Sequence, residues 1–194
     1  MISIQMRKPI IVLFILIIGI ILIGWAAKTI HTSNVEAKYS TPNNLKDIQQ
    51  DLTNWQNRGD EEHNTTLIKV VHLGKSDTYI AFFNSESDVL GIATMKEGPN
   101  KKLRIVNSQY GDGIVKYYGV NTDKGSYGIV IGKSLDKQIH FIRVELQNDP
   151  LKFTVQVPED DYFITVKKLP KGVSSKKFAD LYLFDKNNKE INPN

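Results

Sequence analysis

Hydrophobic residues follow two different patterns along this chain: one unbroken run near the N-terminus, and an alternating pattern over most of the remainder. The run covers residues 9–27 (PIIVLFILIIGIILIGWAA) and contains no charged side chain. A helix of about 19 residues is roughly 28 Å long, which matches the bilayer hydrocarbon core of about 30 Å. A helix in a soluble core normally keeps a polar stripe, and this run has none. The pattern therefore predicts a transmembrane helix over residues 9–27.

The alternative for this run is a cleavable signal peptide. The apolar core of a signal peptide is about 7–15 residues long, which is shorter than the run here and favours a retained anchor. Small residues do follow the run, at residues 24–27 and 35–37, so cleavage and release as a secreted protein remain an alternative. Trp25 suits the aromatic belt at a membrane interface.

Flanking charges predict the orientation of this helix. Arg7 and Lys8 directly precede the run, whereas the other side begins with Lys28, followed by Lys38 and Glu36. By the positive-inside rule, residues 1–8 are expected to form a cytoplasmic stub and the rest to lie outside the cytoplasm. We expect a single-pass protein of the cell membrane. Residues 28–40 (KTIHTSNVEAKYS) are polar, lack an apolar period, and are expected to form a stalk.

A short amphipathic helix is expected after the stalk. Leu45, Ile48, Leu52 and Trp55 are spaced to share one helix face. Thr41 is a suitable N-cap with Pro42 in the first turn. Gly59 can end the helix.

From Leu67 onward the apolar positions recur every second residue. In Lys152–Val157, for example, Phe153, Val155 and Val157 alternate with polar side chains, as in a half-buried strand. The same alternation places His140 on one face with Ile142. Strands are expected at residues 67–73, 79–83, 89–95, 103–106, 114–120, 127–131, 139–146, 152–157, 162–167 and 178–184.

Turn residues separate these strands at intervals typical of antiparallel folds. We therefore expect a mainly β (α+β) fold: the transmembrane helix, one short amphipathic helix, and then an antiparallel β-sandwich or partly open barrel. Residues 41–191 are expected to form one extracytoplasmic domain, with a possible seam at Gly111-Asp112-Gly113.

Composition narrows the function classes. The chain has no cysteine, so disulfides and thiolate metal sites are excluded. Its formal charge is +4, with both signs interspersed, and no basic stripe of the nucleic-acid-binding type appears. Lysine pairs at 101–102, 167–168 and 176–177 are interpreted as scattered solvated charges, with attraction to an anionic wall polymer or lipid headgroups as the alternative.

Candidate chemistry is sparse, and no catalytic, cofactor-binding or metal-ligating set is predicted. The four histidines are not at metal-ligand spacing. Asp185, Asn187 and Glu190 loosely resemble a calcium loop but lack its glycine and ligand order, so a hairpin turn is preferred. The remaining candidate is an exposed aromatic surface of the kind that binds partners. It would comprise Tyr110, Tyr117, Tyr118 and Tyr127, with Tyr117 and Tyr118 on opposite strand faces.

Several segments resemble a known module: Tyr118–Val120, Gly128–Ser134 (GIVIGKS), Ile139–Val144 (IHFIRV) and Leu181–Ile191 (LYLFDKNNKEI). They are similar to the C-terminal β-sandwich of signal-anchored extracytoplasmic proteins of Gram-positive, spore-forming bacteria. The resemblance covers about residues 113–191, and it implies a fold and no catalytic residues.

These observations predict a membrane-anchored, non-enzymatic binding or accessory module of the cell envelope. Its expected partners are the lipid bilayer, through residues 9–27, and an envelope protein or wall polymer, without nucleic acid. The alternatives are an envelope hydrolase whose site forms only in three dimensions, and a secreted protein.

Overall fold

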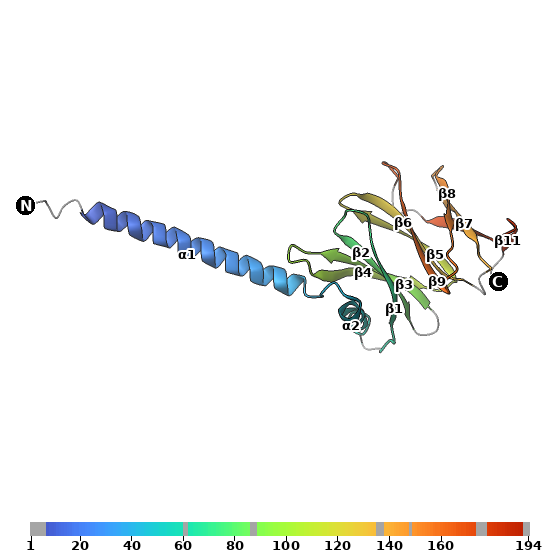
Figure 1. Cartoon of the computed structure of the whole chain (residues 1–194), viewed down its shortest axis with the longest axis horizontal. Helices are drawn as coiled ribbons and strands as arrows, with labels where there is room; N and C mark the ends of the chain where they lie inside the picture. The colour runs from blue at the N-terminus through green and yellow to red at the C-terminus, as the bar shows by residue number, and fades with distance from the viewer. Residues whose placement is uncertain are drawn as a thin grey trace, which may run out of the picture. The chain divides into compact units, whose positions relative to one another are not determined.

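The computed structural model describes residues 7–59, 62–85, 89–134, 138–147, 149–173 and 178–191. The chain divides into two compact units, Met1–Ser40 and Thr41–Asn194. The first unit is helical and the second is mostly β (Figure 1).

The described part of the first unit contains the helix α1, Arg7–Lys38. It extends beyond the apolar run, so most of the segment expected as a stalk is helical, which the lack of an apolar period did not predict. The hydroxyls of Thr29 and Thr32 donate to the carbonyls of Trp25 and Lys28, one turn earlier. Each residue added to an existing helix gains one backbone hydrogen bond without the cost of forming a new first turn. A polar sequence can therefore continue the helix.

The predicted amphipathic helix is α2, Leu45–Gln56, with Asn44 as its N-cap and Asn57 as its C-cap. The predicted caps Thr41 and Gly59 were therefore wrong. Asn44 accepts the backbone N–H of Asp47 at 3.1 Å, the usual N-cap bond. Ile48 and Leu52 are buried as expected, whereas Leu45 leaves 65% of its surface exposed.

Eleven strands follow in the described part of the chain, and ten of them correspond to the predicted strands. Their bounds are β1 Thr66–His72, β2 Thr78–Ser85, β3 Val89–Glu97, β4 Leu103–Gly111, β5 Val115–Thr122, β6 Gly125–Lys133, β7 Phe141–Leu146, β8 Lys152–Gln156, β9 Tyr162–Lys168, β10 Ala179–Phe184 and β11 Glu190–Ile191. The two-residue strand β11 was not predicted.

The strands form three antiparallel sheets, with the orders β1-β2-β3-β4, β5-β6-β9 and β11-β10-β7-β8. The expected mainly β, antiparallel fold is confirmed. The chain leaves the first sheet at Gly111 and enters the second at Val115, so the suspected seam is a crossing between sheets within one compact unit.

Three apolar clusters show how these sheets are layered. One face of the first sheet packs on α2 through Phe83, Met95 and Leu103, together with Ile48 and Leu52. The opposite face of that sheet packs against the second sheet.

The second sheet is therefore the middle layer of the β unit. Ile129 and Ile131 of β6 face the first sheet, whereas Val130 of β6 and Phe163 of β9 face the third, where they meet Ile142. This explains why β6 is apolar on both faces.

Candidate functional site

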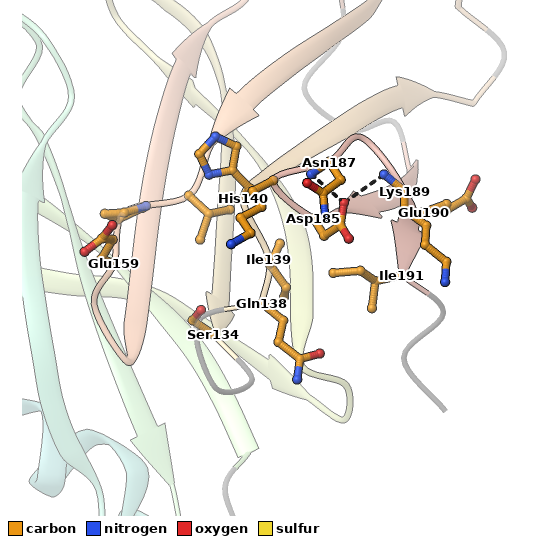
Figure 2. Close-up of a pocket in the computed structure, with 13 residues that line it drawn as sticks. Ser134, Gln138, Ile139, His140, Glu159, Asp185, Asn187, Lys189, Glu190 and Ile191 are labelled. Carbon is orange, nitrogen blue, oxygen red and sulfur yellow. Dashed lines mark hydrogen bonds between the residues drawn. The ribbon is translucent and has the colours of Figure 1, made fainter.

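A pocket of about 730 Å³ opens at one end of the second and third sheets, which pack together through Val130 and Phe163 of the second (Figure 2). It lies where β6 ends, β7 begins, β8 ends and β10 turns into β11. Ile139, Val157 and Ile191 give it apolar walls, and polar side chains that include Gln138 and Glu159 surround them. A concave site with apolar walls and a few polar groups is the usual form of a small-ligand site.

The turn between β10 and β11 forms one side of this pocket. The carboxylate of Asp185 accepts the backbone N–H groups of Asn187 and Lys189, both at 2.8 Å (Figure 2). These bonds, that from Lys189 foremost, lower the pKa of Asp185. Asn188 adopts a left-handed φ of 61°, which asparagine tolerates. The pattern that loosely resembled a calcium loop is a hairpin turn, and no cluster of metal-ligating side chains occurs in the described residues.

The pocket also contains a serine, a histidine and a carboxylate, but they do not form a triad. No hydrogen bond joins the side chains of Ser134, His140 and Glu159 among the described residues, and Figure 2 shows the three well separated. The Oγ of Ser134 is buried without a hydrogen-bond partner in this part of the chain. A hydrolytic triad requires those bonds, so the geometry does not assemble one here.

The predicted alternation of β7 holds for Ile142, Val144 and Leu146, which are buried, but the predicted start of the strand was wrong. The alternation placed His140 on one face with Ile142, but the strand begins at Phe141, His140 is exposed, and the preceding Ile139 is buried. The backbone of His140 instead links strands, since its N–H donates to the Phe184 carbonyl at 2.7 Å. A periodic pattern cannot show where a strand begins, so this error lies at an element boundary.

The four predicted tyrosines do not make one exposed surface. Tyr110, at the end of β4, is 60% exposed, but Tyr127 is only 5% exposed and lies in the core between the first two sheets. Tyr117 and Tyr118 do lie on opposite faces of β5, each packed on a different core. The prediction that Tyr127 belongs to a shared exposed surface was wrong, because this residue lies between the first and second sheets.

Burial also affects the chemistry of this tyrosine pair. It raises the pKa of the Tyr118 phenol to about 12, because the ionised form loses its hydration. Burial raises the pKa of Tyr117 in the same direction, and the Tyr117 hydroxyl has no hydrogen-bond partner among the described residues. Both side chains are therefore partly buried and pack against the two cores.

No protein family, curated protein or solved structure matches this chain. The site must accordingly be interpreted from its own geometry.

An aromatic row, which was not predicted, lies on the outer face of the third sheet. Phe141 and Phe184 stack with ring centres 4.7 Å apart. The guanidinium of Arg143 lies 4.6 Å from the ring centre of Tyr182 and 5.2 Å from that of Phe184. These residues alternate with the buried residues of β7 and β10, so the period-two pattern contained the signal for them.

Proposed function

We propose that this chain is a single-pass membrane protein whose β unit lies outside the cytoplasm and acts as a binding module of the cell envelope. The observation that carries the proposal is the exposure of α1. Within the described residues it is the one helix long and apolar enough to cross a bilayer, and none of that stretch is buried.

The exposed side chains of α1 support a lipid environment. Ile20 is 70% exposed, Ile23 71% and Trp25 69%. Exposed apolar surface costs about 25 cal/mol per Å² in water, so a fully exposed column of such residues favours a hydrocarbon surrounding. The charges of Arg7 and Lys8 favour a cytoplasmic N-terminus.

Two features of the β unit support binding. The pocket beside Asp185 offers apolar walls with polar groups around them, and the row formed by Phe141, Phe184, Arg143 and Tyr182 presents aromatic and guanidinium surface. Tyrosine and arginine are enriched among residues that dominate protein interfaces. An envelope protein or a wall polymer is the proposed partner.

The absence of cysteine from the chain allows a direct test of orientation. Asp160→Cys and Ser3→Cys each introduce a single thiol, one in the β unit and one before α1. In intact cells, a membrane-impermeant maleimide should label Asp160→Cys, whereas Ser3→Cys should react only after lysis. The reverse labelling pattern would contradict the orientation, and full-length protein in the soluble cytosolic fraction would contradict the anchor.

Signal cleavage is tested on the same material. The mass of the membrane-bound protein should include residues 1–27. A shortened protein in the medium would favour the secreted alternative.

A further inference from the structure

We infer that the end of the β unit where the chain enters it docks on an anionic phospholipid surface. This inference rests on the proposed membrane anchor. The surface, called here the lysine end, consists of residues 73–77, 96–102, 122–125 and 167–171. It includes two of the lysine pairs that appeared scattered in the sequence.

Contacts between turns gather these four segments at one end. The backbone N–H of Glu97 donates to the Asp77 carbonyl at 2.7 Å, and that of Leu169 donates to the Ser126 carbonyl at 2.9 Å. The Tyr127 hydroxyl lies directly over the Gly74 turn. In Figure 1 the β3–β4 and β5–β6 hairpins lie on the same side of the β unit.

The entry of the chain lies at the same end. Thr41, the first residue of the β unit, pairs with Leu103 at the start of β4. Leu45, at the start of α2, leaves 65% of its surface exposed and provides an apolar side chain for insertion between headgroups. The chain therefore enters beside the lysines.

The lysine end carries an excess of positive charge. Its segments contain eight lysines and three carboxylates, a surplus of five positive charges. Each of the three carboxylates already has a lysine partner: Asp77 with Lys96 at 2.6 Å, Glu97 with Lys101 at 2.9 Å, and Asp123 with Lys124 at 2.9 Å. The acidic groups at this end are thus neutralised locally.

The surplus lysines are available for an external anion. Lys75, Lys167, Lys168 and Lys171 are exposed, and none of them forms an ion pair with another described residue. The beginning of β9, at the opposite end of the strand, is preceded by the exposed carboxylates of Glu159, Asp160 and Asp161. The charge is therefore polarised along β9, with the positive end nearer the entry of the chain.

The length of α1 brings this end within reach of headgroups. A helix of 32 residues is about 48 Å long, compared with about 40–45 Å for a bilayer with its headgroup regions. With residues 9–27 in the hydrocarbon core, residues 28–38 extend about 16 Å further and pass the outer headgroups by about 10 Å. That gap is comparable with the Debye length of about 8 Å at physiological ionic strength, so the lysines attract the anionic lipid through partial screening.

The test uses the full chain inserted in vesicles, with a fluorophore attached to Pro99→Cys at the lysine end or to Asp160→Cys at the opposite end. The vesicles contain phosphatidylcholine, either alone or mixed with phosphatidylglycerol. They also contain a lipid with a nitroxide on its headgroup, which quenches a fluorophore that comes close to the membrane surface. Quenching at Pro99→Cys should rise with phosphatidylglycerol and fall again in high salt. The label at Asp160→Cys should not respond.

Two matched triple variants separate a specific surface from net charge. Lys75, Lys167 and Lys168 are changed to Gln in one, and Lys69, Lys186 and Lys189 in the other. Each lysine near an anionic surface contributes about fivefold to the affinity, so the affinity of the first variant's lysine end for the anionic surface should be about a hundredfold lower. The second should dock like the parent chain. Equal losses in both variants would overturn the inference.

Flotation with neutral vesicles reports the anchor separately. Protein that floats but shows no dependence on phosphatidylglycerol contradicts the docking alone, whereas protein that does not float contradicts the proposed anchor as well. A response of the Pro99→Cys label to soluble polyphosphate but not to phosphatidylglycerol would indicate a wall polymer and overturn lipid docking.

Discussion

Thr41 and Leu103 exchange two backbone hydrogen bonds, 3.1 Å from the Thr41 nitrogen to the Leu103 oxygen and 2.7 Å in the reverse direction. Both residues are buried. The Thr41 hydroxyl also donates to the Asp51 carboxylate of α2 at 2.7 Å. This single residue therefore joins the start of the β unit to both its edge strand and its helix.

Thr41→Pro should destabilise the β unit. Proline has no N–H, so the buried Leu103 carbonyl loses its donor, at a cost of about 1–3 kcal/mol. Thr41→Val keeps the backbone pair and loses only the bond to Asp51, so it should cost less. The free energies of unfolding from denaturant titration compare the two variants, and equal values would contradict the importance assigned to the backbone pair.

Gly132→Ala should also destabilise the fold. A Cβ at this position would overlap the Phe163 ring and approach the Ile114 carbonyl to 2.9 Å, and overpacking of this kind costs about 1–3 kcal/mol. Gly59→Ala is the matched control, because a Cβ there meets nothing within 4 Å. Thermal unfolding should separate the two variants, and a Gly132→Ala protein as stable as the control would refute the close packing.

Tyr118 should titrate near pH 12, because burial raises its pKa to about 12. A folded-state pKa above the unfolded value of about 10 means that its contribution to stability is complete below pH 10 and lost as the pH approaches 12. Tyr118→Phe should remove this phenolate from the absorbance titration and reduce the loss of stability in alkali. Ionisation of Tyr118 near pH 10 in the folded protein would contradict its burial.

The Asp185 turn should loosen in acid. Its backbone hydrogen bonds lower the pKa of the carboxyl, so its contribution is present above the unfolded value of about 3.9 and is lost as the pH falls through the lower folded value. The protection of the Asn187 and Lys189 amides, measured as exchange relative to the intrinsic rate at each pH, should fall over that range. In Asp185→Ala these amides should exchange faster at neutral pH already, and unchanged protection would show that the turn does not depend on the carboxylate.

The strands were predictable because local alternation records which side chains are buried. Phe153 and Val155 identify β8 from a window of six residues, and the apolar faces of Tyr79–Phe83 identify β2. The exposed column of α1 is equally local, since an uninterrupted apolar run needs no tertiary information to be recognised.

The errors arise where tertiary contacts decide. Thr41 has the chemistry of an N-cap but pairs with a strand distant in sequence, so Asn44 caps α2 instead. A tyrosine such as Tyr127 can lie either at a surface or in a core, and only the packing of the first sheet on the second shows that it is buried. The pocket at Asp185 draws on four separate strand ends, a juxtaposition that no window of sequence contains.

The middle position of the β5-β6-β9 sheet limits how this chain can diverge. A half-exposed sheet has one face on which polar substitutions are tolerated, but Ile129 and Val130 point into different cores, and an unpaired polar group in either would cost several kilocalories per mole. Sequence drift is therefore confined to the turns and the outer faces, so distant relatives should be recognisable by a conserved apolar ribbon at β6 long after their surfaces have lost all similarity.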